Sequence, residues 1–144
     1  MTQSSEKITP LGFFDPQVVA VFEGGVDKHQ AGDLAGAESD YRHVLEISDG
    51  HPGALNLLGV VHHQRGDHER AIEYLERALA IAPDNADFHL NLGAAYFAMD
   101  KLEEAERHFR RSVEMSPANP EANGNLGTVL KNIGRREEAL ECYK

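Results

Sequence analysis

The 144-residue sequence predicts an all-α fold, a solenoid of antiparallel helix pairs, and three observations support this prediction. Residues of the same kind recur with a period of 34 along most of the chain. Each unit of this length contains two stretches in which apolar residues follow one another at three- and four-residue steps, as on one face of a helix. A turn separates the two stretches. A fixed period of this length is typical of stacked repeats, in which each unit contacts mainly its neighbours.

The period appears at four kinds of position, all in phase. They are the glycines Gly25, Gly59, Gly93 and Gly127, the alanines Ala37, Ala71, Ala105 and Ala139, the series Tyr41, Leu75, Phe109 and Tyr143, and the prolines Pro83 and Pro117. With the prolines as unit ends, residues 18–144 form the array, divided into units 18–51, 52–85, 86–119 and a partial unit 120–144. We expect the leader, residues 1–17, to be disordered or to cap the first unit through its apolar residues Leu11, Phe13 and Phe14.

Eight helices and no strand are expected, at 17–31, 33–48, 52–65, 68–82, 86–99, 102–116, 120–133 and 136–144. In the first two units a Gly-Asp turn separates the paired helices, at Gly32-Asp33 and at Gly66-Asp67. Glycine fits the left-handed position after a helix end, and aspartate can cap the helix that follows. A turn at Gly134-Arg135 separates the paired helices of the fourth unit.

The second helix of each unit is expected to bury one face. In 68–82 the apolar residues Ile72, Leu75, Ala78 and Leu79 recur at helical steps, while the charged residues face away. Proline ends such helices because it disfavours helix in the residue before it. A glycine inside a helix costs roughly 1 kcal/mol relative to alanine. The glycine series inside the first helices therefore indicates close approach of the paired helices.

These positions resemble the tetratricopeptide repeat (TPR) family, whose unit reads W-x2-L-G-x2-Y, then A-x3-F, then P. The third unit matches best, at Leu92, Gly93, Tyr96, Ala105, Phe109 and Pro117. The second unit has His62 where the family prefers tyrosine, and the first departs at Gly24, Lys28 and Asp49. The resemblance implies a right-handed superhelix with the first helix of each unit on its concave side, and a module for protein–protein interaction.

By the repeat register, ten residues of the first helices are expected to bind a peptide or a partner protein in this concave groove. They are Phe22, Asn56, Val60, His63, Leu90, Asn91, Ala94, Phe97, Asn125 and Thr128. Asn91 and Asn125 share one register, and a carboxamide can bond to both the N–H and the C=O of an extended peptide. The alternative is that asparagine is only tolerated on a solvated face.

Composition disfavours several other partners. The net charge is −10 and the chain has no basic stripe, so neither nucleic acid nor an anionic membrane is an expected partner. The first unit is the most acidic, which indicates solvation or, alternatively, docking of a basic partner. No apolar run approaches the roughly 18 residues of a membrane helix. The single cysteine, Cys142, excludes an internal disulfide and suits a reducing, cytoplasmic location.

No catalytic residue, metal site or cofactor is expected, and the chain by itself is not predicted to be an enzyme. No two of the eight histidines are three or four residues apart. The nearest candidate for a metal site is His29 with His63, at equivalent positions in adjacent units, without a cysteine or carboxylate to complete the set. The glycines near 24 and 127 lack a P-loop lysine.

Binding of an acidic chaperone tail is not expected. TPR domains that clamp such tails use lysines, an arginine and asparagines from three successive first helices. The corresponding residues here are Phe22, Val26, Leu57, Asp87 and Asn91, or one unit further Asn56, Val60, Asn91, Glu121 and Asn125. Neither set supplies a cation, and each has an acid where a lysine is needed.

The Asn-Leu-Gly phrases at 91–93 and 125–127 are similar to the repeat arm of O-linked N-acetylglucosamine transferases and their bacterial relatives. This similarity implies an alternative function, the substrate-recruiting arm of a larger glycosyltransferase.

The last unit stops at Lys144, before its final turn, which predicts an uncovered apolar edge. The residues expected there are Leu126, Leu130, Ile133, Leu140 and Tyr143. We therefore expect either a fragment of a longer protein or a homodimer formed through this repeat.

Overall fold

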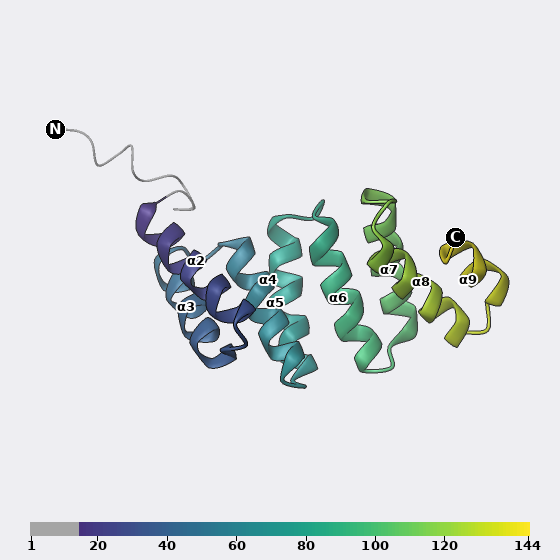
Figure 1. Cartoon of the computed structure of the whole chain (residues 1–144), viewed down its shortest axis with the longest axis horizontal. Helices are drawn as coiled ribbons and strands as arrows, with labels where there is room; N and C mark the ends of the chain where they lie inside the picture. The colour runs from purple at the N-terminus through teal and green to yellow at the C-terminus, as the bar shows by residue number, and fades with distance from the viewer. Residues whose placement is uncertain (1–14) are drawn as a thin grey trace.

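The computed structural model describes residues 15–144, which form eight α-helices and no strand. The helices are α2 (Pro16–Gln30), α3 (Leu34–Ile47), α4 (Pro52–Gln64), α5 (His68–Ile81), α6 (Ala86–Ala98), α7 (Leu102–Met115), α8 (Pro120–Asn132) and α9 (Arg136–Cys142). Each end lies within two residues of the predicted one. Figure 1 shows the helices as hairpins stacked side by side in an elongated array, from α2 at one end to α9 at the other.

The beginning of the array differs slightly from the prediction. Helix α2 starts at Pro16, and the Asp15 side chain caps it by accepting a hydrogen bond from the Gln17 N–H at 2.8 Å. The last residues assigned to the leader therefore belong to the first helix. Its apolar residues Leu11, Phe13 and Phe14 lie outside the described residues.

The turns within the pairs follow the predicted chemistry. Gly32, Gly66 and Gly134 have φ angles of 87°, 86° and 89°, which favour glycine. The predicted aspartate caps are confirmed, since Asp33 accepts from the Gly36 N–H and Asp67 from the Arg70 N–H. The third pair differs, because Asp100 takes the left-handed position with φ of 61°.

The glycine series does bring the paired helices close together. A Cβ atom placed on Gly93 would lie 2.6 Å from the Phe109 ring, and one placed on Gly59 would lie 2.7 Å from Leu75. Real Cβ contacts are not this short. Glycine therefore lets a large side chain of the second helix lie directly against the first helix.

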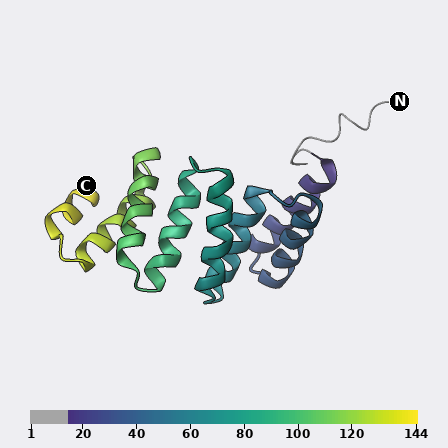
Figure 2. The same cartoon turned by 180° about the vertical axis from the view of Figure 1, so that it is seen from behind.

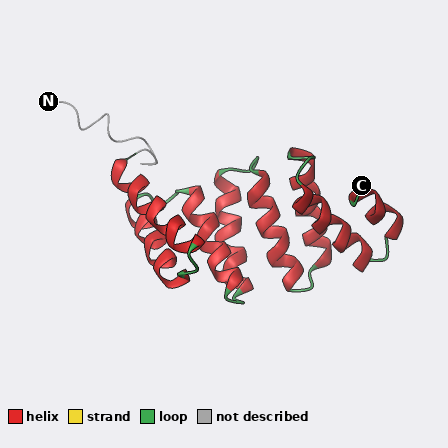
Figure 3. Cartoon of the chain, viewed as in Figure 1, coloured by secondary structure: helices red, strands yellow, loops and turns green. Residues whose placement is uncertain are grey.

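The helices form two layers, first helices on one side and second helices on the other. Each second helix packs on the first helix of the next unit, and α6 also contacts both α4 and α8. Successive first helices thus pack together more closely than successive second helices, as in an array that curves toward the first-helix side. The reverse view in Figure 2 and the colouring in Figure 3 show the same stack of helices joined by short loops.

The predicted edge at the C-terminal end is only partly correct. Leu126 and Leu130 are 4% and 1% exposed, because α8 is covered by α7 on one side and α9 on the other. Ile133 is half-buried against the core. Leu140 and Tyr143 on the last hairpin are exposed, at 62% and 52%.

Candidate functional site

Three successive first helices surround an open cavity of about 390 Å³. The residues that line it are His63 from α4, Ala94, Phe97 and Ala98 from α6, Phe109 from α7, and Asn125 and Thr128 from α8. Five of the ten residues predicted for the groove therefore lie around one cavity.

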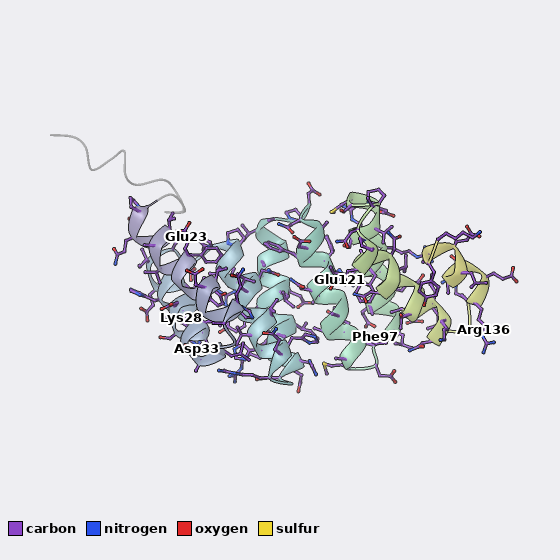
Figure 4. All side chains as sticks on the ribbon, in the orientation of Figure 1. Glu23, Lys28, Asp33, Phe97, Glu121 and Arg136 are labelled. Carbon is purple, nitrogen blue, oxygen red and sulfur yellow. The ribbon has the colours of Figure 1, made fainter. Side chains whose placement is uncertain are left out.

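The walls of the cavity follow from the helical repeat. Ala94 and Ala98 are one turn apart on α6 and leave space because their side chains are small. Phe97 adds an aromatic wall, and Figure 4 labels it on α6 near the middle of the array. Phe109 is 2% exposed and reaches the cavity from the second layer because Gly93 offers no Cβ to block its ring.

The three asparagines predicted for the groove have different roles. The Asn91 side chain donates a hydrogen bond to the Asn56 Oδ1 at 3.0 Å, and Asn56 is 6% exposed. This pair links α4 to α6 and is largely engaged within the protein. The Asn125 carboxamide makes no side-chain hydrogen bond with the described part of the chain, so both its donor and its acceptor are available at the cavity.

Polar groups at the cavity carry no positive charge near neutral pH. The Nδ1 atoms of His63 and His68 lie 2.9 Å apart, so at least one of these two rings must be neutral. Burial, with a smaller contribution from His68, lowers the pKa of His63 below its usual 6.5. The Thr128 hydroxyl donates to the Gly124 carbonyl oxygen at 3.0 Å and keeps its acceptor lone pairs.

Five of the ten predicted groove residues do not line the cavity: the hydrogen-bonded pair Asn56 and Asn91, and three further residues. Leu90 is 6% exposed and lies in the hydrophobic core, so its side chain offers almost no surface to a ligand. Phe22 packs on the rings of His51 and Tyr41, with centroids 4.8 and 6.0 Å away. Val60 is half-buried on α4.

Sequence reasoning missed two residues that line the cavity. Ala98 follows Ala94 by four positions, and this helical spacing could have identified it. Phe109 belongs to a second helix and gave no such signal, because its contribution depends on how α7 lies behind α6.

The histidines are arranged differently from the one pairing considered in the sequence. His29 bonds to the Tyr41 hydroxyl at 3.0 Å and to the Gln64 Oε1 at 2.8 Å, while the Nδ1 atoms of His89 and His108 lie 3.1 Å apart. Within residues 15–144 no three side chains of the usual metal-binding types are grouped to hold an ion. No helix in the same range is long and apolar enough to cross a membrane.

Comparison with known sequences identifies the repeats. One model described as tetratricopeptide repeat matches residues 25–84 and 54–118, and a second with the same description matches residues 120–144. No curated protein sequence matches the chain.

Comparison with solved structures gives the same architecture. A crystal structure of MamA superposes with a TM-score of 0.81 at 20% identity, covering 99% of this chain and 91% of that one. The first TPR domain of Spaghetti (RPAP3), bound to the HSP90 peptide SRMEEVD, gives 0.77 at 22% identity over 81% of this chain and 92% of that one. An O-GlcNAc transferase from Thermobaculum terrenum gives 0.80 at 24% identity, covering 99% of this chain but 26% of the transferase chain.

Proposed function

This chain belongs to the tetratricopeptide repeat family, and we propose that it is a non-catalytic interaction module that binds an extended peptide segment of a partner protein. The binding surface is the groove of the first helices, centred on the cavity between α4, α6 and α8.

The observation that carries this proposal is that three successive units line one cavity. A ligand that occupies the cavity contacts three repeats at once, which suits an extended chain better than a compact small molecule. Ala94, Ala98 and Phe97 give an apolar surface for one side chain of the ligand. The available carboxamide of Asn125 can bond to the ligand backbone. The peptide bound to the Spaghetti domain supports this class of ligand for the fold.

A selection with displayed peptides tests the proposal. A random peptide library displayed on mRNA is selected on the full chain, and binding of the enriched peptides is then compared between two variants. Thr128→Arg places a long side chain in the cavity from an exposed position on α8, whereas Ser39→Arg makes a similar change at an exposed position on α3. We expect Thr128→Arg to weaken binding by at least tenfold and Ser39→Arg to leave it within about twofold.

The asparagines provide a second test. Asn91→Ala combined with Asn125→Ala should weaken peptide binding without unfolding the protein, and Asn125→Ala alone should account for most of the loss because the Asn91 amide is engaged by Asn56. Binding that is equal in the wild type, Thr128→Arg and the double variant would refute a ligand in this groove.

A second candidate function is the substrate-recruiting arm of a larger glycosyltransferase. The in-register amides on α6 and α8 and the likeness in fold to the transferase over 99% of this chain favour it. The intact mass of the protein isolated from its native cells separates the two functions. A mass near 15.9 kDa supports a separate module, and a much larger mass supports an arm.

A further inference from the structure

We propose that the peptide bound by this groove carries a bulky apolar side chain, which enters the cavity, and a lysine or arginine two or three residues away, which faces Asp87 and Glu121. This inference rests on the proposed function and specifies the chemistry of its ligand.

Both carboxylates lie on the same helix faces as the cavity. Glu121 precedes Asn125 by four residues and Thr128 by seven, and residues with these spacings share one face of a helix. Asp87 precedes the cavity residue Ala94 on α6 by seven residues, the same spacing as between Glu121 and Thr128 on α8.

Neither carboxylate is neutralised by the protein. Asp87 and Glu121 are exposed, and neither takes part in any of the ion pairs of residues 15–144. The basic residues Lys131 and Arg136 line a separate hollow with Leu140 and Tyr143 at the C-terminal end of the array. Negative charge therefore lies toward the N-terminal ends of α6 and α8, and positive charge lies beyond the cavity.

The spacing of the two ligand groups follows from helix geometry. At 1.5 Å of rise per residue, Glu121 is about 6 Å along the helix from Asn125, and Asp87 is about 10 Å from Ala94. An extended peptide advances about 3.3 Å per residue. A basic residue two or three positions from the apolar one can therefore reach the carboxylates while the apolar side chain fills the cavity.

An acid in the first turn of a helix can also be present only because it interacts favourably with the helix dipole. Glu103 and Glu137 occupy this first-turn position in α7 and α9, which belong to the outer layer. They are exposed, like Asp87 and Glu121, and provide a control with the same change in net charge at the same kind of helix position.

The test uses the full chain and the displayed random library. The most enriched peptide and a version with its lysine or arginine replaced by glutamine are titrated by fluorescence anisotropy. The proteins are the wild type, Asp87→Asn with Glu121→Gln, and Glu103→Gln with Glu137→Gln. We expect the enriched peptides to combine a bulky apolar residue with a basic one. The groove variant should bind the basic peptide about tenfold more weakly than the wild type, and the outer variant within about twofold.

Two results would overturn the inference while leaving the proposed function intact. One is a set of enriched peptides that Thr128→Arg blocks but that contain no basic residue. The other is an equal loss of affinity in the groove variant and the outer variant, which would assign the effect to overall charge. Enriched peptides that Thr128→Arg does not block would instead refute the proposed function itself.

Discussion

Replacing Gly93 by alanine isolates the energetic role of the repeated glycine in the first helices. The new Cβ would lie 2.6, 2.7 and 3.2 Å from three atoms of the Phe109 ring, whereas carbon atoms in favourable contact are about 3.5–4.0 Å apart. Phe109 is 2% exposed, so nearly all of its ring is packed against other atoms. The ring or the helix must therefore move by about 1 Å.

Two opposing effects determine the result. Alanine is favoured over glycine inside a helix by roughly 1 kcal/mol. Insertion of an extra carbon into a well-packed core typically costs about 1–3 kcal/mol. We expect Gly93→Ala to lower the free energy of unfolding by up to about 2 kcal/mol, the difference between these two effects, and the displaced Phe109 ring should also weaken peptide binding at the cavity.

Gly124 in α8 provides the matched control, because a Cβ added there meets no other atom within 4 Å. Gly124→Ala should therefore raise the free energy of unfolding by about 0.5–1 kcal/mol through helix propensity alone. Gly127→Ala should fall between the two, since its Cβ would meet the ring of Tyr143, which is 52% exposed and can move. Urea unfolding followed by circular dichroism measures all three. A Gly93→Ala protein as stable as the Gly124→Ala protein would refute this account of the glycine series.

Three further predictions concern pH, a turn and a ligand. Burial and, to a smaller extent, the charge of Arg107 lower the pKa of His108 from 6.5 to about 4. The neutral His108 ring therefore stabilises the fold fully above about pH 6.5, and this stabilisation is lost as the pH falls toward 4. Urea unfolding should show that the free energy of unfolding of the wild type falls by up to about 2 kcal/mol between pH 7.5 and pH 5, and by less in His108→Gln. An equal fall in both proteins would contradict this role of His108. Asp100→Gly should raise the melting temperature, because glycine adopts a φ of 61° without the cost of about 1 kcal/mol that other residues have in this conformation. Asp100→Ala should not raise it. Equal effects of the two substitutions would mean that the lost charge causes the change. The HSP90 peptide SRMEEVD should show no binding in calorimetry, because acids stand where a cation is needed, and micromolar affinity would disprove this reasoning.

Part of the candidate site could be predicted from the sequence, because the first helices repeat in register. His63, Ala94, Phe97, Asn125 and Thr128 were all expected in the groove, and the structure brings them around one cavity. Whether they bind a peptide is still a prediction.

Other features of the site could not be predicted from the period. Asn56 and Asn91 are 35 residues apart, one more than the repeat, so a strict register does not pair them although their side chains bond. Leu90 occupies the same repeat position as the predicted groove residues Phe22 and Asn56, yet it lies in the core. A small rotation of a helix about its own axis is enough to decide which of the side chains on one face are buried.

The amino-acid sequence was sufficient to predict the eight helices of residues 15–144, their pairing and the family. Helix ends and turns depend on residues only a few positions apart, such as the glycine at Gly66 and the cap at Asp67, and these effects act in any repeat of this type. Which side chains meet between helices became known from the packing of the helices in three dimensions. Contacts such as those of His63 with His68 and of Phe109 with the cavity depend on the distance and rotation of packed helices, which no local pattern specifies.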